Sequence, residues 1–160
     1  MIRTSLVTVA LAMSLVSATS AQNAPDLVTE LLLAGNPCSE AANNPSASAA
    51  IGICQSALVN LDAIKTSHPS MNVHESNIYF IMQAVAHTTI GSKMGAIDGV
   101  RSARTCSELE LAWKAYASVD ESQSPANYAG DMKTMKVQAA PAVRLCRSEF
   151  GVQFGAPPLP

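Results

Sequence analysis

The sequence has few aromatic residues and few charges. Aromatic residues make up 4% of the 160 residues, and charged residues make up 14%. Lys and Arg number 10 against 12 Asp and Glu, so the net charge is −2. This balance excludes the strongly basic surface that is typical of nucleic-acid-binding proteins, and we expect no nucleic acid among the partners.

Catalytic and metal-binding motifs are also missing. His74-Glu75 begins like the HExxH motif of zinc proteases, but Ile78 stands where the second histidine is required. The sequence has no GxSxG, SxxK or P-loop motif, no CxxC and no CxxCH, which excludes covalently attached haem. We expect no cofactor, no metal ion and no catalytic residue. An enzyme would need a cleft that holds His87 beside a carboxylate such as Asp98 or Glu75.

The N-terminal segment has the layout of a secretory signal peptide. A short, positively charged start (Met1–Ser5) precedes an apolar run (Leu6–Val16) and a small, polar stretch (Ser17–Ala21), with a cut expected before Gln22. The apolar run is far shorter than the roughly 20 residues of a membrane-spanning helix, and we expect no later run to be long enough. Residues 1–21 should therefore be removed and the mature chain exported, to a bacterial periplasm or, alternatively, to the medium.

Four cysteines lie beyond this segment. An even number of cysteines in an exported chain indicates disulfides, and four cysteines allow three pairings. We predict Cys38–Cys54 and Cys106–Cys146, because each pair would join neighbouring segments of a helical chain. A zinc site is the alternative, but the paired Cys/His spacing of such sites is absent.

The apolar residues follow a helical period, and no stretch alternates like a strand. This predicts an all-α fold: one small domain of five or six helices over residues 22–150, pinned by two disulfides. Removal of the signal peptide leaves about 139 residues, within the usual size of one domain. An alanine-rich chain with few aromatic residues favours helices that approach each other closely.

The first helix is expected over Leu27–Ala34 and should end at Gly35, with a loop over Asn36–Ser46. A second helix should follow, capped by Ser46 or Ser48. Its predicted buried face consists of Ala50, Ile53, Cys54, Ala57, Leu58, Leu61 and Ile64. Cys54 would then bond to Cys38 in the preceding loop.

The middle of the chain predicts two more helices. The polar stretch Ser67–His74 should be a connection, and the third helix should begin at Glu75 or Ser76. Gly91-Ser92-Lys93 predicts a tight turn, after which a fourth helix begins at Met94.

A capping box formed by Ser107 and Glu110 predicts that a further helix begins there. The competing hypothesis is one unbroken helix over Met94–Val119. The two hypotheses differ in whether the chain turns between the third helix and the Trp113 region.

The last helix should begin at the N-cap and first-turn pair Ser124-Pro125. We expect it to run to Phe150 with a kink at Pro141, and Gly151 should end it. Residues 151–160 contain three prolines and are predicted to be a disordered tail.

The stretch Phe80–Ala103 resembles one helical hairpin of the tetratricopeptide family. Small residues stand where that family's helices touch, at a spacing of twelve and then seven: Ala84, Ala96 and Ala103. Ile90-Gly91 resembles the inter-helix turn, Ala96-Ile97-Asp98 resembles the start of the second helix, and Ala50–Leu58 resembles part of an earlier, degenerate unit. The resemblance implies a role in binding proteins or peptides, and it implies no catalytic residues.

Trp113 and Tyr116 lie three residues apart on one helical face and are the candidates for a recognition surface. The alternative is that both anchor the core against Met132 and Met135. Nearby acidic residues are expected to form a solvated face: Glu108, Glu110, Asp120 and Glu121. The three histidines, His68, His74 and His87, are expected to be solvated.

These features favour an exported helical protein-interaction module that binds another protein or the cell envelope. One version is an immunity-type inhibitor of a secreted toxin. The alternative is a carrier for a small apolar ligand, because methionines can line adaptable pockets. Those methionines are Met82, Met94, Met132 and Met135. An enzyme is the third hypothesis.

Overall fold

The computed structural model describes residues 26–99, 101–123, 126–151 and 159 of the chain, and in this part the regular structure is entirely helical. The all-α prediction is confirmed. The predicted signal peptide, the predicted Ser124-Pro125 cap and most of the proline-rich tail lie outside the described residues. The helices are α1 (Leu27–Ala41), α2 (Ala47–Ser67), α3 (Val73–Asp98), α4 (Ala103–Ala117), the 3₁₀ helix η1 (Glu121–Gln123) and α5 (Ala126–Phe150).

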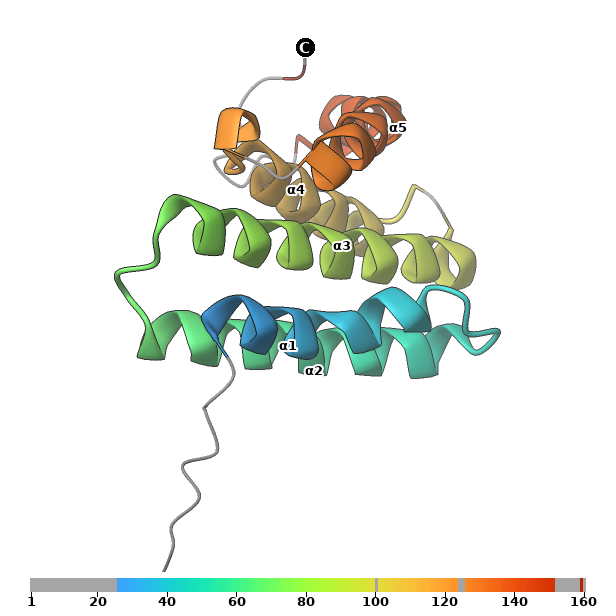
Figure 1. Ribbon diagram of the computed structural model, residues 1–160. Helices are drawn as coiled ribbons and strands as arrows, with labels where there is room; N and C mark the ends of the chain where they lie inside the picture. The colour runs from blue at the N-terminus through green and yellow to red at the C-terminus, as the bar shows by residue number, and fades with distance from the viewer. Residues whose placement is uncertain (1–25, 100, 124–125, 152–158, 160) are drawn as a thin grey trace, which may run out of the picture.

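The helices form layers on either side of α3 (Figure 1). The hairpin of α1 and α2 packs on one side of α3, α4 packs on the other side, and α5 packs on α4. Because α3 is covered from two directions, it buries residues around most of its circumference, among them Ile78, Ala84 and Ile90. The central helix therefore does not require a continuous solvent-facing polar side. Its contacts set the positions of both outer layers.

Two kinds of core hold α3 against the first layer. One contains large side chains: Leu31, Leu61, Ile64, Ile78, Tyr79, Ile81, Met82 and Val119. The other contains small side chains around the first disulfide: Cys38, Ala41, Ala50, Cys54, Ala57, Ala86, Ile90 and Met94. Small residues allow α1, α2 and α3 to approach closely at the end where the disulfide lies.

Both predicted disulfides are confirmed. The Cα atoms of Cys38 and Cys54 lie 4.5 Å apart, and those of Cys106 and Cys146 lie 5.3 Å apart. The first bond ties α1 to α2 and the second ties α4 to α5. In the loop-entropy account they stabilise the domain by about 3 and about 4 kcal/mol respectively, since the second closes the longer loop.

The prediction that α1 ends at Gly35 is wrong, because the helix continues to Ala41 through Gly35 and Pro37. Gly35 is buried against Met82 of α3, and a Cβ added to it would lie 2.5 Å from the Met82 sulfur. Its small size thus serves a helix contact and does not end the helix. Consequently Cys38 lies in the last part of α1, and the expected loop is reduced to residues 42–46.

The starts of α2 and α3 are capped as short polar side chains predict. Ser46 caps α2 by accepting a hydrogen bond from the Ala49 N–H. Asn72 caps α3 in a capping box with Glu75, so α3 begins two residues before the predicted start and includes His74. The expectation that Ile53 is buried is wrong, since it lies exposed on α2.

The predicted turn at Gly91-Ser92-Lys93 is also wrong, because α3 runs through it to Asp98. Gly91 is buried beside Leu109 of α4, so it provides a close helix approach. The chain breaks instead at Gly99, whose φ of 90° suits glycine, and Ser102 caps α4. The helix start predicted at Ser107 and the unbroken helix Met94–Val119 are therefore both wrong.

This arrangement corrects the hairpin expected within Phe80–Ala103. The residues from Phe80 to Asp98 form a single helix, and no turn separates Ala84 from Ala96. Ala84 is fully buried, whereas Ala96 and Ala103 are exposed. The three alanines do not share a helix crossing.

The C-terminal end of α5 agrees with its prediction. Gly151 has a φ of 63°, and its N–H donates to the Arg147 carbonyl. Pro141 lies inside the helix as expected. Cys146 is thereby placed in the last two turns, opposite Cys106 of α4.

Candidate functional site

An apolar hollow follows the outer side of the first hairpin, between α1 and α2. We call it the α1–α2 groove. It has a volume of about 270 Å³ and is lined by Leu33, Ala34, Pro37, Ile53, Ser56, Ala57 and Asn60. A second, broader hollow of about 580 Å³ adjoins it at Pro37 and Ile53 and extends to the α1–α2 loop.

The first disulfide lies directly behind the α1–α2 groove. Cys38 follows Pro37 in α1 and Cys54 follows Ile53 in α2, and both cysteines are buried while Pro37 and Ile53 face solvent. The covalent bond therefore fixes the spacing of the two groove walls. Lys93 of α3 adds a further tie, because its ammonium donates to the carbonyl of Asn44 in the loop.

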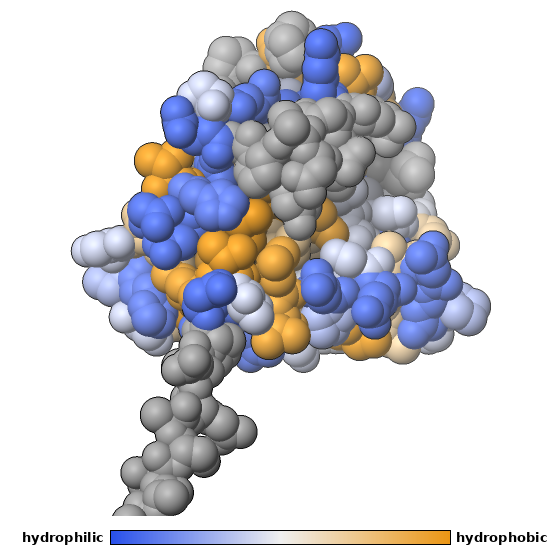
Figure 2. Space-filling view, in the orientation of Figure 1, coloured by the Kyte–Doolittle hydropathy of each residue, from blue (hydrophilic) through white to orange (hydrophobic). Residues whose placement is uncertain are grey.

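Large apolar side chains are unusually exposed on this hairpin. Leu33 is 64% exposed and Val59 is 67% exposed. Figure 2 shows apolar residues gathered over the first part of α1 and the adjacent part of α3, with polar residues towards the α1–α2 loop. This patch is distinct from the α1–α2 groove, whose lining comes from α1 and α2 alone. An exposed apolar surface bordered by polar residues is typical of contact with another protein.

Within the described residues, α2 is the helix that is long and apolar enough, by length and composition, to cross a membrane. A single helix of this kind is weak evidence for a span, because core helices of globular domains meet the same criteria. In this domain, however, the face with Ala50, Cys54 and Leu61 is packed against α1 and α3. In the most apolar stretch of α2, 28% of the residues are buried, so one face of the helix is packed and the other faces are at least partly exposed.

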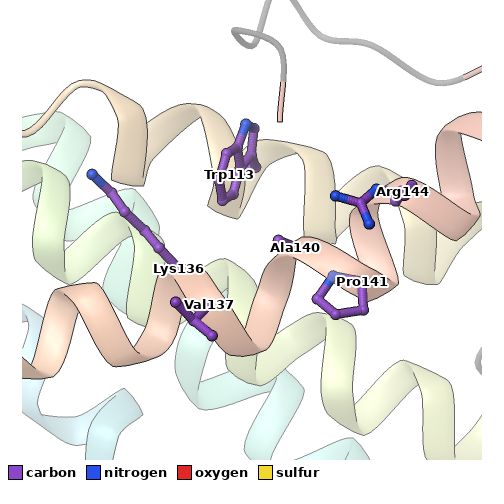
Figure 3. A pocket seen from close by; sticks show the side chains of 6 residues that line it. All are labelled: Trp113, Lys136, Val137, Ala140, Pro141 and Arg144. Atoms are coloured by element: carbon purple, nitrogen blue, oxygen red, sulfur yellow. The ribbon is translucent and has the colours of Figure 1, made fainter. Parts of the chain in front are cut away.

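Trp113 and Tyr116, the predicted recognition pair, are both buried. Tyr116 bonds through its hydroxyl to Thr88 of α3, and burial raises the pKa of its phenol. The alternative role as core anchors agrees with this burial, but the side chains of Met132 and Met135 lie outside the described residues. Trp113, 4% exposed, also forms one wall of a pocket between α4 and α5 (Figure 3).

The expectation that His87 is solvated is wrong, because it meets a carboxylate, although neither of the two named for the enzyme hypothesis. Its Nδ1 lies 2.8 Å from a carboxylate oxygen of Glu108, and both side chains are largely buried between α3 and α4. Glu75 is engaged in the α3 cap and Asp98 pairs with Arg104. A histidine–carboxylate pair can transfer protons, but all four cysteines are bonded and supply no thiol nucleophile.

The expected solvated acidic face is confirmed for Asp120 and Glu121, which are exposed, and is wrong for Glu110 and for Glu108, which lies half-buried beside His87. Glu110 is fully buried and binds Arg147 of α5 through two hydrogen bonds, and this contact raises the pKa of Arg147. Asp120 exchanges two backbone hydrogen bonds with the buried side chain of Asn77. The Glu110 carboxylate therefore ties α4 to α5, whereas at Asp120 it is the backbone that binds α3 and the carboxylate accepts from Ser122.

The other histidines lie apart from this pair. His68 and His74 are exposed, as expected, and His68 approaches Glu30 at 3.9 Å. Across the described part of the chain, no group of three or more His, Cys, Asp or Glu residues could hold a metal ion.

The fold and its surfaces thus define a small all-α domain with two stapled helix pairs. No protein-family model, curated protein or solved structure matches the chain.

Proposed function

We propose that the protein is an exported, non-catalytic binding module that holds an apolar segment of another protein in the α1–α2 groove. The observation that carries the proposal is an exposed apolar groove whose two walls are fixed by the Cys38–Cys54 bond. A binding surface that is rigid before contact loses less conformational entropy when the partner docks.

The chemistry of the groove favours an uncharged, apolar segment as its occupant. Its lining contains Leu33, Pro37 and Ile53 and no charged residue, and Glu40 lines only the adjoining hollow. The two disulfides support an oxidising, extracytoplasmic location, which the N-terminal signal-like segment also favours. The partner would then be another exported or envelope protein, which includes a secreted toxin.

The test is affinity capture from the envelope extract of the source cells with groove variants. Leu33→Glu and Ile53→Glu place a charge in the groove at exposed positions, so the fold should persist. Val59→Glu is the matched control, because Val59 is exposed on the same helix but does not line the groove. We expect the wild type and Val59→Glu to retain a stoichiometric partner and the two groove variants to lose it.

Two results would count against the proposal: no stoichiometric partner for the wild type after crosslinking, or equal capture by all four proteins. Thermal unfolding of each variant separates loss of binding from loss of fold.

Two of the four methionines behind the ligand-carrier alternative, Met82 and Met94, are buried in different cores, and the side chains of Met132 and Met135 are outside the described residues.

A further inference from the structure

A hollow of about 240 Å³ lies on the other side of α3 from the α1–α2 groove, where α3, α4 and α5 meet. We call it the three-helix pocket. Each helix contributes part of its lining: Gly91, Ser92 and Gly95 from α3, Thr105 and Leu109 from α4, and Ala142 and Leu145 from α5. The α1–α2 groove continues into a broader hollow, whereas this pocket has walls from three helices.

The pocket exists because several of the residues that line it are small. Gly91 and Gly95 lie about one turn apart on α3 and carry no side chain, and Ala142 of α5 carries only a methyl group. Leu109 of α4 packs on Gly91, where an added Cβ would lie 3.2 Å from a Leu109 methyl carbon. The side chain of Leu109 therefore closes the pocket beside Gly91 and leaves the space next to Gly95 and Ala142 unfilled.

The second disulfide fixes two walls of this pocket. Thr105 directly precedes Cys106 in α4, and Leu145 directly precedes Cys146 in α5. The covalent bond sets the distance between the two helices at this point, which opposes their collapse into the empty volume. A pocket that is formed before the ligand arrives loses little conformational entropy on binding.

The chemistry of the lining favours an uncharged ligand. The described residues that line the pocket are uncharged and mostly apolar. The hydroxyl of Thr105 is engaged within the protein, since it accepts from the Ser102 hydroxyl and donates to the Gly99 carbonyl. Ser92 is exposed, so its hydroxyl lies on the solvent side. An ion would lose its hydration here without gaining a partner, whereas an apolar molecule is favoured by leaving water.

We propose that the three-helix pocket binds a small, uncharged, apolar molecule of about the size of one aromatic ring. A dry apolar cavity of about 150 Å³ is large enough for benzene. The larger volume here accommodates a ring with a short substituent. The ring would lie over the two glycines of α3 and contact Leu109 and Leu145. This site is independent of the α1–α2 groove, and its ligand belongs to the class named in the carrier hypothesis.

The probe is toluene, and benzoate is its charged match because a carboxylate replaces the methyl group. Methyl resonances in NMR spectra of the oxidised protein report on the pocket through Leu109, Ala142 and Leu145, and on the groove through Leu33. We expect saturable shifts with toluene at the three pocket residues and no comparable shift at Leu33. Benzoate should give no saturable shift at the pocket residues.

Three substitutions test the assigned volume. Ala142→Leu fills the pocket from α5 and should weaken toluene binding by at least about tenfold, the equivalent of roughly 55 Å² of apolar contact surface. Gly95→Ala adds one methyl group to the α3 wall and should weaken binding about two- to fourfold. Ala96→Leu is the matched control for Ala142→Leu, because Ala96 is an exposed alanine of α3 outside the lining, and it should bind toluene like the wild type.

The proposal is overturned if toluene gives no saturable shift at the pocket residues, if Leu33 responds equally, or if benzoate binds as tightly as toluene. Equal affinities of the wild type, Ala142→Leu and Gly95→Ala would overturn it as well. Thermal unfolding of each variant separates loss of the pocket from loss of the fold. Gly95→Ala keeps the test decisive if Ala142→Leu does not fold, because alanine suits a helix interior better than glycine does.

Discussion

Each of the two outer layers of the molecule is held by its own disulfide, but the noncovalent contacts within the two layers differ. Each is a helix pair joined by one disulfide, α1–α2 on one side of α3 and α4–α5 on the other. The first pair carries three acidic residues and one basic residue, whereas α5 alone carries four basic and two acidic residues. A disulfide can thus be combined either with close apolar packing or with a buried ion pair.

The difference extends to the outer surfaces. The first pair presents Leu33 and Ile53 to solvent beside its disulfide, and this surface suits an apolar segment of a protein. The second pair presents Lys136 and Arg144 around Trp113, at a hollow between α4 and α5. The following experiments test how far the two layers really differ.

The largest effect should come from breaking the buried ion pair of the second layer. In Arg147→Ala the fully buried carboxylate of Glu110 loses its guanidinium, and we expect the free energy of unfolding to fall by about 3–5 kcal/mol. Urea denaturation measures this loss.

The control for that experiment is the double variant Glu110→Leu/Arg147→Met. It removes both charges and should recover most of the stability. If Arg147→Ala lies within about 1 kcal/mol of the wild type, water must reach Glu110 and the second layer does not depend on the pair.

The next effect separates the two disulfides. Replacing Cys106 and Cys146 together by alanine should cost about 4 kcal/mol, and replacing Cys38 and Cys54 should cost about 3 kcal/mol, because the loop closed by Cys106–Cys146 is the longer one. Urea midpoints of both double variants give the order. The reverse order would show that the charge-poor first layer relies more on its covalent bond.

A smaller effect tests the close packing of the first layer. The methyl group added in Gly35→Ala would lie too close to the Met82 side chain, even to its Cβ, which cannot rotate away. We therefore expect α1 to be pushed from α3 at a cost of about 1–3 kcal/mol. Gly52→Ala is the matched helical control, since nothing lies within 4 Å of its added Cβ. That variant should gain about 0.5–1 kcal/mol. Equal changes in melting temperature would contradict the close contact.

The smallest effect concerns the cap of α1. The Thr29 N–H donates to Asp26 and lowers the pKa of that carboxyl below its ordinary value of 3.8. Because the folded pKa is the lower one, the cap stabilises the fold fully above about pH 3.8, and this stabilisation is lost as the pH falls through the folded pKa.

Asp26→Asn keeps the capping oxygen and removes the titration. The difference in melting temperature between the wild type and Asp26→Asn should be constant above pH 5 and should change only in the acid range. A difference independent of pH down to pH 2 would contradict the assignment.

The sequence predicted the helices and both disulfides because these depend on short-range patterns. Periodic apolar residues and short polar caps act within a few positions, and Cys38 and Cys54 lie on helices that follow one another. The ends of α1 and α3 were predicted wrongly because Gly35 and Gly91 act through distant partners, Met82 and Leu109. From the sequence alone, a glycine that allows close helix packing cannot be distinguished from a glycine that ends a helix.

The candidate surfaces were harder to predict for the same reason. Ile53 was assigned to the buried face of α2, but that predicted face was too wide for α1 and α3 to cover completely. The width of this apolar face was the feature of the sequence that indicated an exposed apolar residue. Glu110 and Glu108 could not be placed, because their partners Arg147 and His87 belong to other helices.

The positions of the two disulfides also bear on how the chain can fold. Both bonds join cysteines that are consecutive in the sequence, so neither loop encloses or crosses the other. A chain that enters an oxidising compartment with its N-terminus first presents Cys38 and Cys54 before Cys106 arrives. Oxidation in the order of arrival then gives the native pairs directly, and folding requires no later exchange of disulfide partners.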